Sequence, residues 1–171
     1  MPGWAQTMTI EVRPIRAEDI ESFHATVEMV ARERKFIARL EVPPIEQVRA
    51  FIQRNIEKGC PQFVAVTDRQ VVGWCNIPPM AREVSAHVGD LFMGLLPQWR
   101  SQGLGAHLLR EALAAADAFG YRRIELGVFA GNANAAALYR KAGFVEEGIK
   151  RRAVLIDGVF HDEIIMARLR D

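Results

Sequence analysis

The hydrophobic and polar positions of this 171-residue chain follow two periods, and the alternation between them predicts its elements. Apolar residues recur every three or four positions, which is typical of helices, at 17–34, 45–58, 104–119 and 135–142. They alternate with polar residues or run together, as in strands, at 9–14, 62–67, 71–77, 86–96, 123–129, 144–156 and 159–169. This order predicts a single α/β (α+β) domain with a mixed central sheet of about seven strands flanked by about four helices.

Turn-forming residues support several of these boundaries. Pro14 ends the first strand, and Gly120 follows the longest helix at the position where left-handed backbone is common. Asp157-Gly158 is a strong signal for a two-residue hairpin between the last two strands. Asn132 or Asn134 is suited to cap the last helix. Residues 35–42 have no clear period and remain ambiguous.

Composition narrows the class of protein and its partners. Half of the residues are apolar and a quarter are charged, and the net charge is only +1, so charge indicates no nucleic-acid partner. Cys60 and Cys75 form no disulfide framework, and no spacing of His and Cys indicates a metal site. No apolar run approaches the ~18–20 residues of a membrane span, and residues 1–8 do not have the apolar region typical of a signal peptide. We therefore expect a flexible leader at 1–8 and a soluble, cytoplasmic domain at 9–171, with no membrane partner.

A glycine-rich loop, Pro97–Gly105, joins the strand ending at Leu96 to the longest helix. Gly103 and Gly105 allow the backbone to turn sharply and to approach a ligand. The first turn of a helix presents unpaired N–H groups and a partial positive charge. Arg100 lies at the start of a helix, where the helix dipole disfavours a cation. A bound anion therefore explains its position better than an ordinary surface charge does. The spacing Arg-x-x-Gly-x-Gly is neither a P-loop nor a dinucleotide fingerprint, and it suits a pyrophosphate.

This loop and a second segment together resemble the GNAT superfamily of N-acetyltransferases. The second segment, residues 132–144, has the pattern Asn-x-x-Ala-x-x-Leu-Tyr-x-x-x-Gly-Phe. Either motif alone is weak, but the pair at this spacing and in this order is a strong signal, and the element order also matches the family. The C-terminal stretch from Glu147 to Ala167 is similar to a bacterial branch that acetylates small amines and amino acids and includes phosphinothricin-type enzymes.

The resemblance implies acetyl-CoA as cosubstrate and assigns roles to residues. Backbone N–H groups of the loop would hold its pyrophosphate, with Arg100 and Lys141 as further phosphate contacts. The backbone at Leu95 would bind the pantetheine arm and orient the thioester, with an N–H of the Gly94–Leu96 region facing the developing oxyanion. Asn132 would bind the arm, and Tyr139 would protonate the leaving thiolate. The cofactor-binding set is Leu95, Leu96, Pro97, Arg100, Ser101, Gln102, Gly103, Leu104, Gly105, Ala106, Asn132, Tyr139 and Lys141.

The family often has Val where this chain has Leu95 and Gly where it has Ser101. Neither difference removes a backbone N–H that the cofactor needs. The general base stays open. Asp90 lies five residues before Leu95, on the strand where family members often place an acid, although a strand-start carboxylate is also an ordinary surface feature. Other candidates are His87, Glu28, Glu33 and a water chain without a single base.

The resemblance implies direct transfer of an acetyl group from acetyl-CoA to a primary amine of a small molecule, such as an amino acid, in a ternary complex. Two alternatives remain: a protein N-terminal or lysine acetyltransferase, and a non-catalytic acyl-CoA sensor. The first two helices, their junction at 34–44 and the 157–158 hairpin are expected to select the acceptor. Lys35, Arg39, Arg151 and Arg152 could bind a carboxylate or phosphonate of the acceptor, but solvated charges are the preferred interpretation. Dimers are common in this fold, so a homodimer is an expectation without an identifiable interface.

Overall fold

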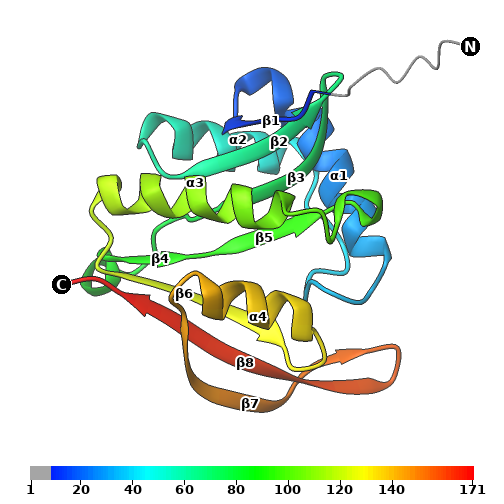
Figure 1. The fold of residues 1–171 in the computed structure, drawn as a ribbon. Coiled ribbons are helices and arrows are strands. Elements are labelled where there is room, and N and C mark those ends of the chain that lie inside the picture. The colour runs from blue at the N-terminus through cyan, green and yellow to red at the C-terminus, as the bar shows by residue number, and fades with distance from the viewer. Residues whose placement is uncertain (1–8) are drawn as a thin grey trace, which may run out of the picture.

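The computed structural model describes residues 9–171, and the leader expected at 1–8 lies outside the described residues. Within the described range the elements follow the predicted order (Figure 1). They are β1 Glu11–Pro14, α1 Ile20–Arg32, α2 Ile45–Glu57, β2 Gln62–Thr67, β3 Gln70–Asn76, β4 Val88–Asp90, β5 Phe92–Leu95, α3 Leu104–Phe119, β6 Arg123–Phe129, α4 Ala133–Lys141, β7 Val145–Ile156 and β8 Val159–Leu169. Short 3₁₀ turns lie at 17–19, 83–85 and 97–99.

The strands of this range form two four-stranded sheets, so the predicted sheet of about seven strands becomes eight strands in two parts. One sheet has the order β1-β2-β3-β5 and is antiparallel. The other has the order β4-β6-β8-β7, in which only β4 and β6 are parallel. The division falls inside the single strand predicted at 86–96, because β4 pairs with β6 while β5 pairs with β3.

Leu91 is the residue at which the two sheets part. Its N–H donates to the Glu125 carbonyl at 2.9 Å, which extends the β4–β6 pairing by one bond. Beyond it, β5 and the second half of β6 diverge, and neither has a partner strand on the facing edge within residues 9–171. The mixed sheet therefore opens at its centre rather than at its margin.

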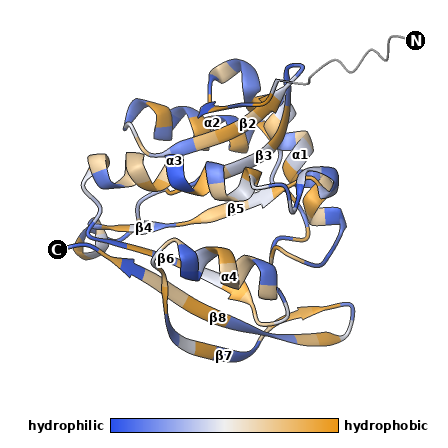
Figure 2. Ribbon diagram, viewed as in Figure 1, coloured by the Kyte–Doolittle hydropathy of each residue, from blue (hydrophilic) through white to orange (hydrophobic). Residues whose placement is uncertain are grey.

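Helices cover both faces of the sheets, with α1 and α2 on one side and α3 and α4 on the other (Figure 1). Apolar residues concentrate along the central strands and on the sheet-facing sides of the helices (Figure 2). On the α1 side, Trp74 of β3 meets Phe23 edge to face, with ring centroids 6.0 Å apart. Gly94 of β5 leaves room for that indole, since a Cβ there would overlap the ring. On the other side, α3 buries Leu108 completely.

Two local predictions are confirmed by backbone geometry. Asp157 and Gly158 have φ values of 50° and 77°, the pair of left-handed residues that a tight hairpin requires. Gly120 has a φ of 102° where it ends α3, a conformation that favours glycine. No helix within residues 9–171 is both long and apolar enough to cross a membrane.

Candidate active site

A cavity of about 1430 Å³ opens where β5 and β6 diverge. One end is bounded by the loop after β5 and by α4, including Ser101, Gly103 and Tyr139. The other end is bounded by α1, the segment 36–43 and α2, with Asp90 on its floor. Ligand sites for single small molecules usually measure about 300–1,000 Å³, so this cavity has room for two reactants.

The loop presents a run of unused backbone donors. Among the described residues, none of the N–H groups from Ser101 to Ala106 donates to another backbone group, and the first intrahelical acceptor, the Gly103 carbonyl, is taken by His107 at 3.1 Å. Gly103 has a φ of 84°, and Ser101 has a φ of 58°, so both turn through the left-handed region. This explains why glycine is common at the position of Ser101. Gly105 lies on the helix, where a Cβ would come within 3.3 Å of Leu95.

Arg100 does not point toward these donors. Its guanidinium donates to both carboxylate oxygens of Glu33 at 2.6 and 2.8 Å and twice to the Leu95 carbonyl at 2.7 and 2.9 Å. It also lies 4.7 Å from the centroid of the Phe36 ring. The backbone N–H of Arg100 donates to the Pro97 carbonyl at 3.2 Å. In the structure the Arg100 side chain thus connects α1, β5 and the loop, and the phosphate contact expected of it stays a prediction.

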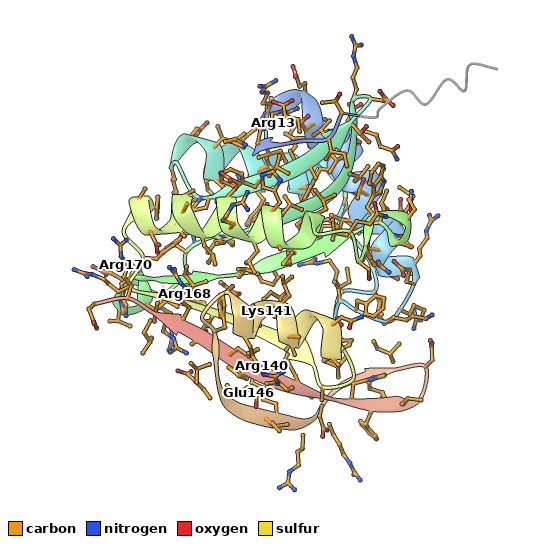
Figure 3. The ribbon with its side chains drawn as sticks, in the orientation of Figure 1. Arg13, Arg140, Lys141, Glu146, Arg168 and Arg170 are labelled. Atoms are coloured by element: carbon orange, nitrogen blue, oxygen red, sulfur yellow. The ribbon has the colours of Figure 1, made fainter. Side chains whose placement is uncertain are left out.

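Arg100 itself lines the cavity, but five residues of the predicted cofactor set do not: Leu96, Pro97, Gln102, Leu104 and Lys141. Leu96 and Leu104 are core residues, and Gln102 is exposed, with its side chain bonded to the Gln98 carbonyl at 2.7 Å. Lys141 is exposed at the C-terminal end of α4, opposite the end that faces the loop (Figure 3). Eight residues of the set line the cavity together: Leu95, Arg100, Ser101, Gly103, Gly105, Ala106, Asn132 and Tyr139.

The edge of β5 that faces the gap carries free backbone groups. The Leu96 N–H donates to the Val72 carbonyl at 2.9 Å, and alternation along an antiparallel strand then directs the Gly94 groups to β3 as well. The groups of Met93 and Leu95 point the other way, into the gap. The Leu95 carbonyl already accepts hydrogen bonds from Arg100. The Leu95 N–H and the N–H and carbonyl of Met93 therefore remain free to bind a ligand in the gap. Of the N–H groups at 94–96, only that of Leu95 faces the gap, so it is the one that could serve as the predicted oxyanion donor. The free groups of Met93 were not predicted from the sequence.

Asn132 and Tyr139 belong to α4. The Asn132 side-chain oxygen accepts from the Ala135 N–H at 3.2 Å, which confirms it as the helix cap and leaves its amide NH₂ for a ligand. Tyr139 is 7% exposed and packs edge to face against Phe144. Burial raises the pKa of the Tyr139 hydroxyl, so the phenol stays protonated at neutral pH. The protonated hydroxyl of Tyr139 can therefore donate a hydrogen bond or a proton to a ligand in the cavity.

Asp90 lies at the end of β4 among other carboxylates. Burial, followed by repulsion from Glu125 and Glu163, raises the pKa of Asp90 to about 6. Glu125 is its neighbour in the β4–β6 register. Glu163 extends from β8 across Gly127, where any Cβ would collide with its carboxylate. Glu125 and Glu163 were missed because only the pairing of distant strands brings them beside Asp90.

Comparison with known proteins agrees with this geometry. A sequence model described as the Acetyltransferase (GNAT) family matches residues 24–144, which is most of the chain. The chain belongs to the GNAT family. It is therefore an acetyl-CoA-dependent N-acetyltransferase, and the resemblance drawn from the two motifs is confirmed.

Three similar proteins illustrate the match. The L-amino acid N-acetyltransferase AaaT of Escherichia coli K12 is 31% identical over 159 residues, which cover 91% of this chain and 97% of AaaT. A GNAT-family acetyltransferase structure from Streptococcus pneumoniae has a TM-score of 0.88 at 30% identity, covering 95% of this chain and all of the other. The fold is shared with a phosphinothricin acetyltransferase from Sinorhizobium meliloti in complex with acetyl-CoA, with a TM-score of 0.87, 22% identity and coverage of 95% and 89%.

The residues of this GNAT protein fit acetyl-CoA. The open N–H groups at 101–106 suit a pyrophosphate, and the free edge of β5 suits an extended arm that carries amide groups. Of the alternative bases, His87 is exposed and Glu28 is half-buried, and neither lines the cavity. Glu33 is bonded to Arg100. Of the four basic residues considered for the acceptor, Arg39 lines the cavity, and Lys35, Arg151 and Arg152 do not.

Proposed function

We propose that this GNAT enzyme acetylates the primary amine of an amino acid or a related small amine by direct transfer in a ternary complex. The observation that carries the proposal is a single cavity lined by the loop with the open donors at 101–106, by Leu95 and Tyr139, and by Asp90. The 31% identity to an L-amino acid N-acetyltransferase over nearly the full length of both chains supports the acceptor class.

The cofactor end would hold acetyl-CoA through backbone groups. The N–H groups from Ser101 to Ala106 bind the pyrophosphate, and Met93, Leu95 and Asn132 bind the arm. When bound, acetyl-CoA supplies the activated acetyl group. The Leu95 N–H then donates to the carbonyl oxygen as negative charge develops on it, which is where fixed donors stabilise acyl transfer most.

Two side chains of opposite character move the protons. Asp90, with a pKa of about 6, is ionised at neutral pH, yet it is more basic than an ordinary aspartate, and it takes the proton of the incoming ammonium group. Tyr139 is neutral and donates its proton to the departing sulfur. Holding both reactants in one cavity contributes roughly 7–11 kcal/mol to lowering the barrier.

The walls of the acceptor end are mainly apolar. Side chains from α1, the segment 36–43 and α2 line it, among them Phe23, Phe36, Ile37, Leu40 and Phe51. An acceptor with an apolar side chain would bury its surface there at about 25 cal/mol per Å². We therefore expect apolar amino acids and amines to be acetylated faster than acidic ones.

A thiol-release screen with acetyl-CoA tests the proposal against both alternatives. Amino acids, alkylamines, polyamines, aminoglycosides and short peptides are compared at equal concentration, and products are identified by mass spectrometry. Release of CoA with apolar amino acids or small amines supports the proposal. Acetylation confined to peptides or intact proteins would assign a protein acetyltransferase. Acetyl-CoA binding without release by any amine would indicate a sensor.

Replacement of Tyr139 by Phe tests the proton donor. We expect kcat to fall by about 10²-fold or more, as is usual for loss of a general acid, while the Kd of acetyl-CoA changes less than about twofold. Tyr121→Phe is the matched control, because the Tyr121 hydroxyl is buried on the Ile77 carbonyl at 2.9 Å and lies outside the cavity lining. That change should lower the midpoint of thermal unfolding and leave kcat unaltered. An unchanged kcat in Tyr139→Phe would remove Tyr139 as the acid.

A further inference from the structure

The acceptor end of the cavity contains a buried oxygen without a partner. Asn76 closes β3 and is 4% exposed, and its Oδ1 makes no hydrogen bond to any residue in the described range. A hydrogen-bond acceptor that is buried without a donor lowers stability, and buried polar groups almost always have hydrogen-bond partners in native proteins. Asn76 also lines the cavity. The oxygen and nitrogen of its amide are nearly equal in size, so a half-turn of the amide presents the oxygen to a ligand there, which can supply the missing donor.

The register of the strands places Asn76 on the cavity floor. Four alternate residues, Trp74, Asn76, Pro78 and Met80, line the cavity, as expected when every second residue faces one side of a sheet. Asn76 is opposite Phe92, and the Asp90 N–H donates to the Pro78 carbonyl at 2.9 Å, so the same register continues past the end of β3.

Asn76 and Asp90 are therefore diagonal neighbours on one face of paired strands. Such neighbours lie about 7–8 Å apart between their Cα atoms, and their side chains reach the same space. A nitrogen placed between them would lie about 3 Å from an oxygen of each. The neutral amide and the carboxylate thus present two acceptors, of different charge, to one donor group.

We propose that Asn76 Oδ1 and the Asp90 carboxylate together hold the acceptor's ammonium group, one hydrogen bond to each. This assignment rests on the proposed function of the cavity and makes Asn76 a substrate-binding residue. In the proton-transfer step one N–H bond breaks, the proton moves to Asp90, and the electron pair stays on nitrogen as the nucleophile. A second N–H remains on Asn76 Oδ1 and keeps the nitrogen in place.

The neutrality of Asn76 matters for this step. An uncharged oxygen accepts a hydrogen bond from an ammonium group and from a neutral amine, so it does not oppose deprotonation. A carboxylate at the same position would favour the ammonium form and would also raise the pKa of Asp90 by like-charge repulsion. Asn76→Asp should therefore retain amine binding but lower kcat, and the acidic limb of its pH–rate profile should move to higher pH.

Binding of simple amines to the enzyme–CoA complex tests the inference without requiring turnover. Titration calorimetry with n-butylamine and L-leucine compares the wild type with Asn76→Leu, which keeps the branching at Cγ but has no side-chain oxygen. We expect at least tenfold weaker amine binding in Asn76→Leu, an acetyl-CoA Kd within twofold of wild type, and an unfolding midpoint that is unchanged or raised because the unpaired oxygen is gone.

Asn55→Leu is the control for loss of a buried amide. Asn55 is also 4% exposed, but its side chain bonds Gln62 at 3.4 Å outside the cavity lining. It should lower the unfolding midpoint and leave amine binding unchanged. Equal amine binding by the wild type and Asn76→Leu, or no amine binding by the wild type, would overturn the inference. Amine binding that depends on Asn76 but is never followed by acetyl transfer would overturn the proposed function alone.

Discussion

At the scale of single residues, two glycines with left-handed backbone lie at the two ends of α3. They allow the effect of backbone strain on stability to be distinguished from an effect on ligand binding. Gly103 has a φ of 84° and Gly120 a φ of 102°, and a Cβ at either would meet no atom within 4 Å. Any side chain at these positions is strained by its backbone rather than by its neighbours. Only Gly103 lines the cavity.

We predict that Gly103→Ala and Gly120→Ala lower the free energy of unfolding by a similar amount, about 1–2 kcal/mol. Only Gly103→Ala should weaken the binding of acetyl-CoA, by tenfold or more, because its Cβ projects into the space where the phosphates approach the backbone. Chemical denaturation and titration calorimetry on the pair give both quantities. Equal acetyl-CoA affinity in the two variants would contradict the pyrophosphate assignment.

Asp90 carries a pH prediction of definite sign. Because a protonated carboxyl cannot accept a proton, kcat/KM for the amine should fall below pH 6, approaching tenfold per pH unit. Glu163→Gln should move this limb to lower pH by removing one repelling charge, and Asp90→Asn should abolish it.

The raised pKa of Asp90 also has a consequence for stability. The folded state binds more protons than the unfolded state between the ordinary value of 3.8 and about 6. The stability that Asp90 contributes is thus present below pH 4 and is lost as the pH rises to 6, so Asp90→Asn should stabilise the protein at pH 8. Rate profiles and denaturation at several pH values measure both effects, and a limb that persists in Asp90→Asn would identify another base.

At the scale of elements, the side chain of Arg100 connects three segments that meet at the cavity. It bonds Glu33 at the end of α1 and the last carbonyl of β5, and it begins in the loop before α3. Glu33 and Arg100 are 21% and 26% exposed, so water screens the pair less than a surface pair.

We predict that Glu33→Gln lowers the free energy of unfolding by about 1–2 kcal/mol, because charge-assisted bonds are lost in a partly buried place. Glu33→Gln should also weaken the binding of acetyl-CoA severalfold, since Glu33 would no longer help to hold Arg100 against β5. Glu28→Gln is the control, because Glu28 forms an exposed pair with Arg32 on the same helix at 2.9 Å. Its effect on stability should stay below about 0.5 kcal/mol. Indistinguishable results for the two variants would show that Arg100 does not connect these elements.

The elements themselves were largely predictable from local pattern. The ranges of α3 and β6 agree with their apolar periods, and the β7–β8 hairpin agrees with its turn residues, Asp157 and Gly158. The break at Leu91 was not predictable, because 86–96 has a strand pattern throughout and only the choice between β3 and β6 divides it. Glu33, 67 positions from Arg100, and the unpaired oxygen of Asn76 depend in the same way on long-range pairing. Local sequence predicted the donors of the loop, and the acceptor end required the fold.

At the scale of the whole molecule, the cavity lies between two sheets that few direct bonds connect. The Leu91–Glu125 bond joins them at one end. Across the opening, Arg34 of the segment after α1 pairs with Asp157 at the tip of the β7–β8 hairpin at 2.8 Å. Residues 33 and 34 are thus tied to opposite walls, Glu33 to Arg100 and Arg34 to Asp157. A ligand that spans the cavity would add contacts to both sheets at once.

We predict that acetyl-CoA at 100 times its Kd stabilises the whole domain by about 2.7 kcal/mol and raises the unfolding midpoint by roughly 5–11 °C. CoA without the acetyl group should give nearly the same shift, because most contacts involve the phosphates and the arm. Hydrogen exchange should slow most at Met93, Leu95 and 101–106, where the N–H groups lack backbone partners, and least in the β2–β3 turn, which is outside the cavity. Gly103→Val at the same ligand concentration serves as the control and should show neither effect. Protection confined to the loop, with β5 unchanged, would place the arm outside the gap between the sheets.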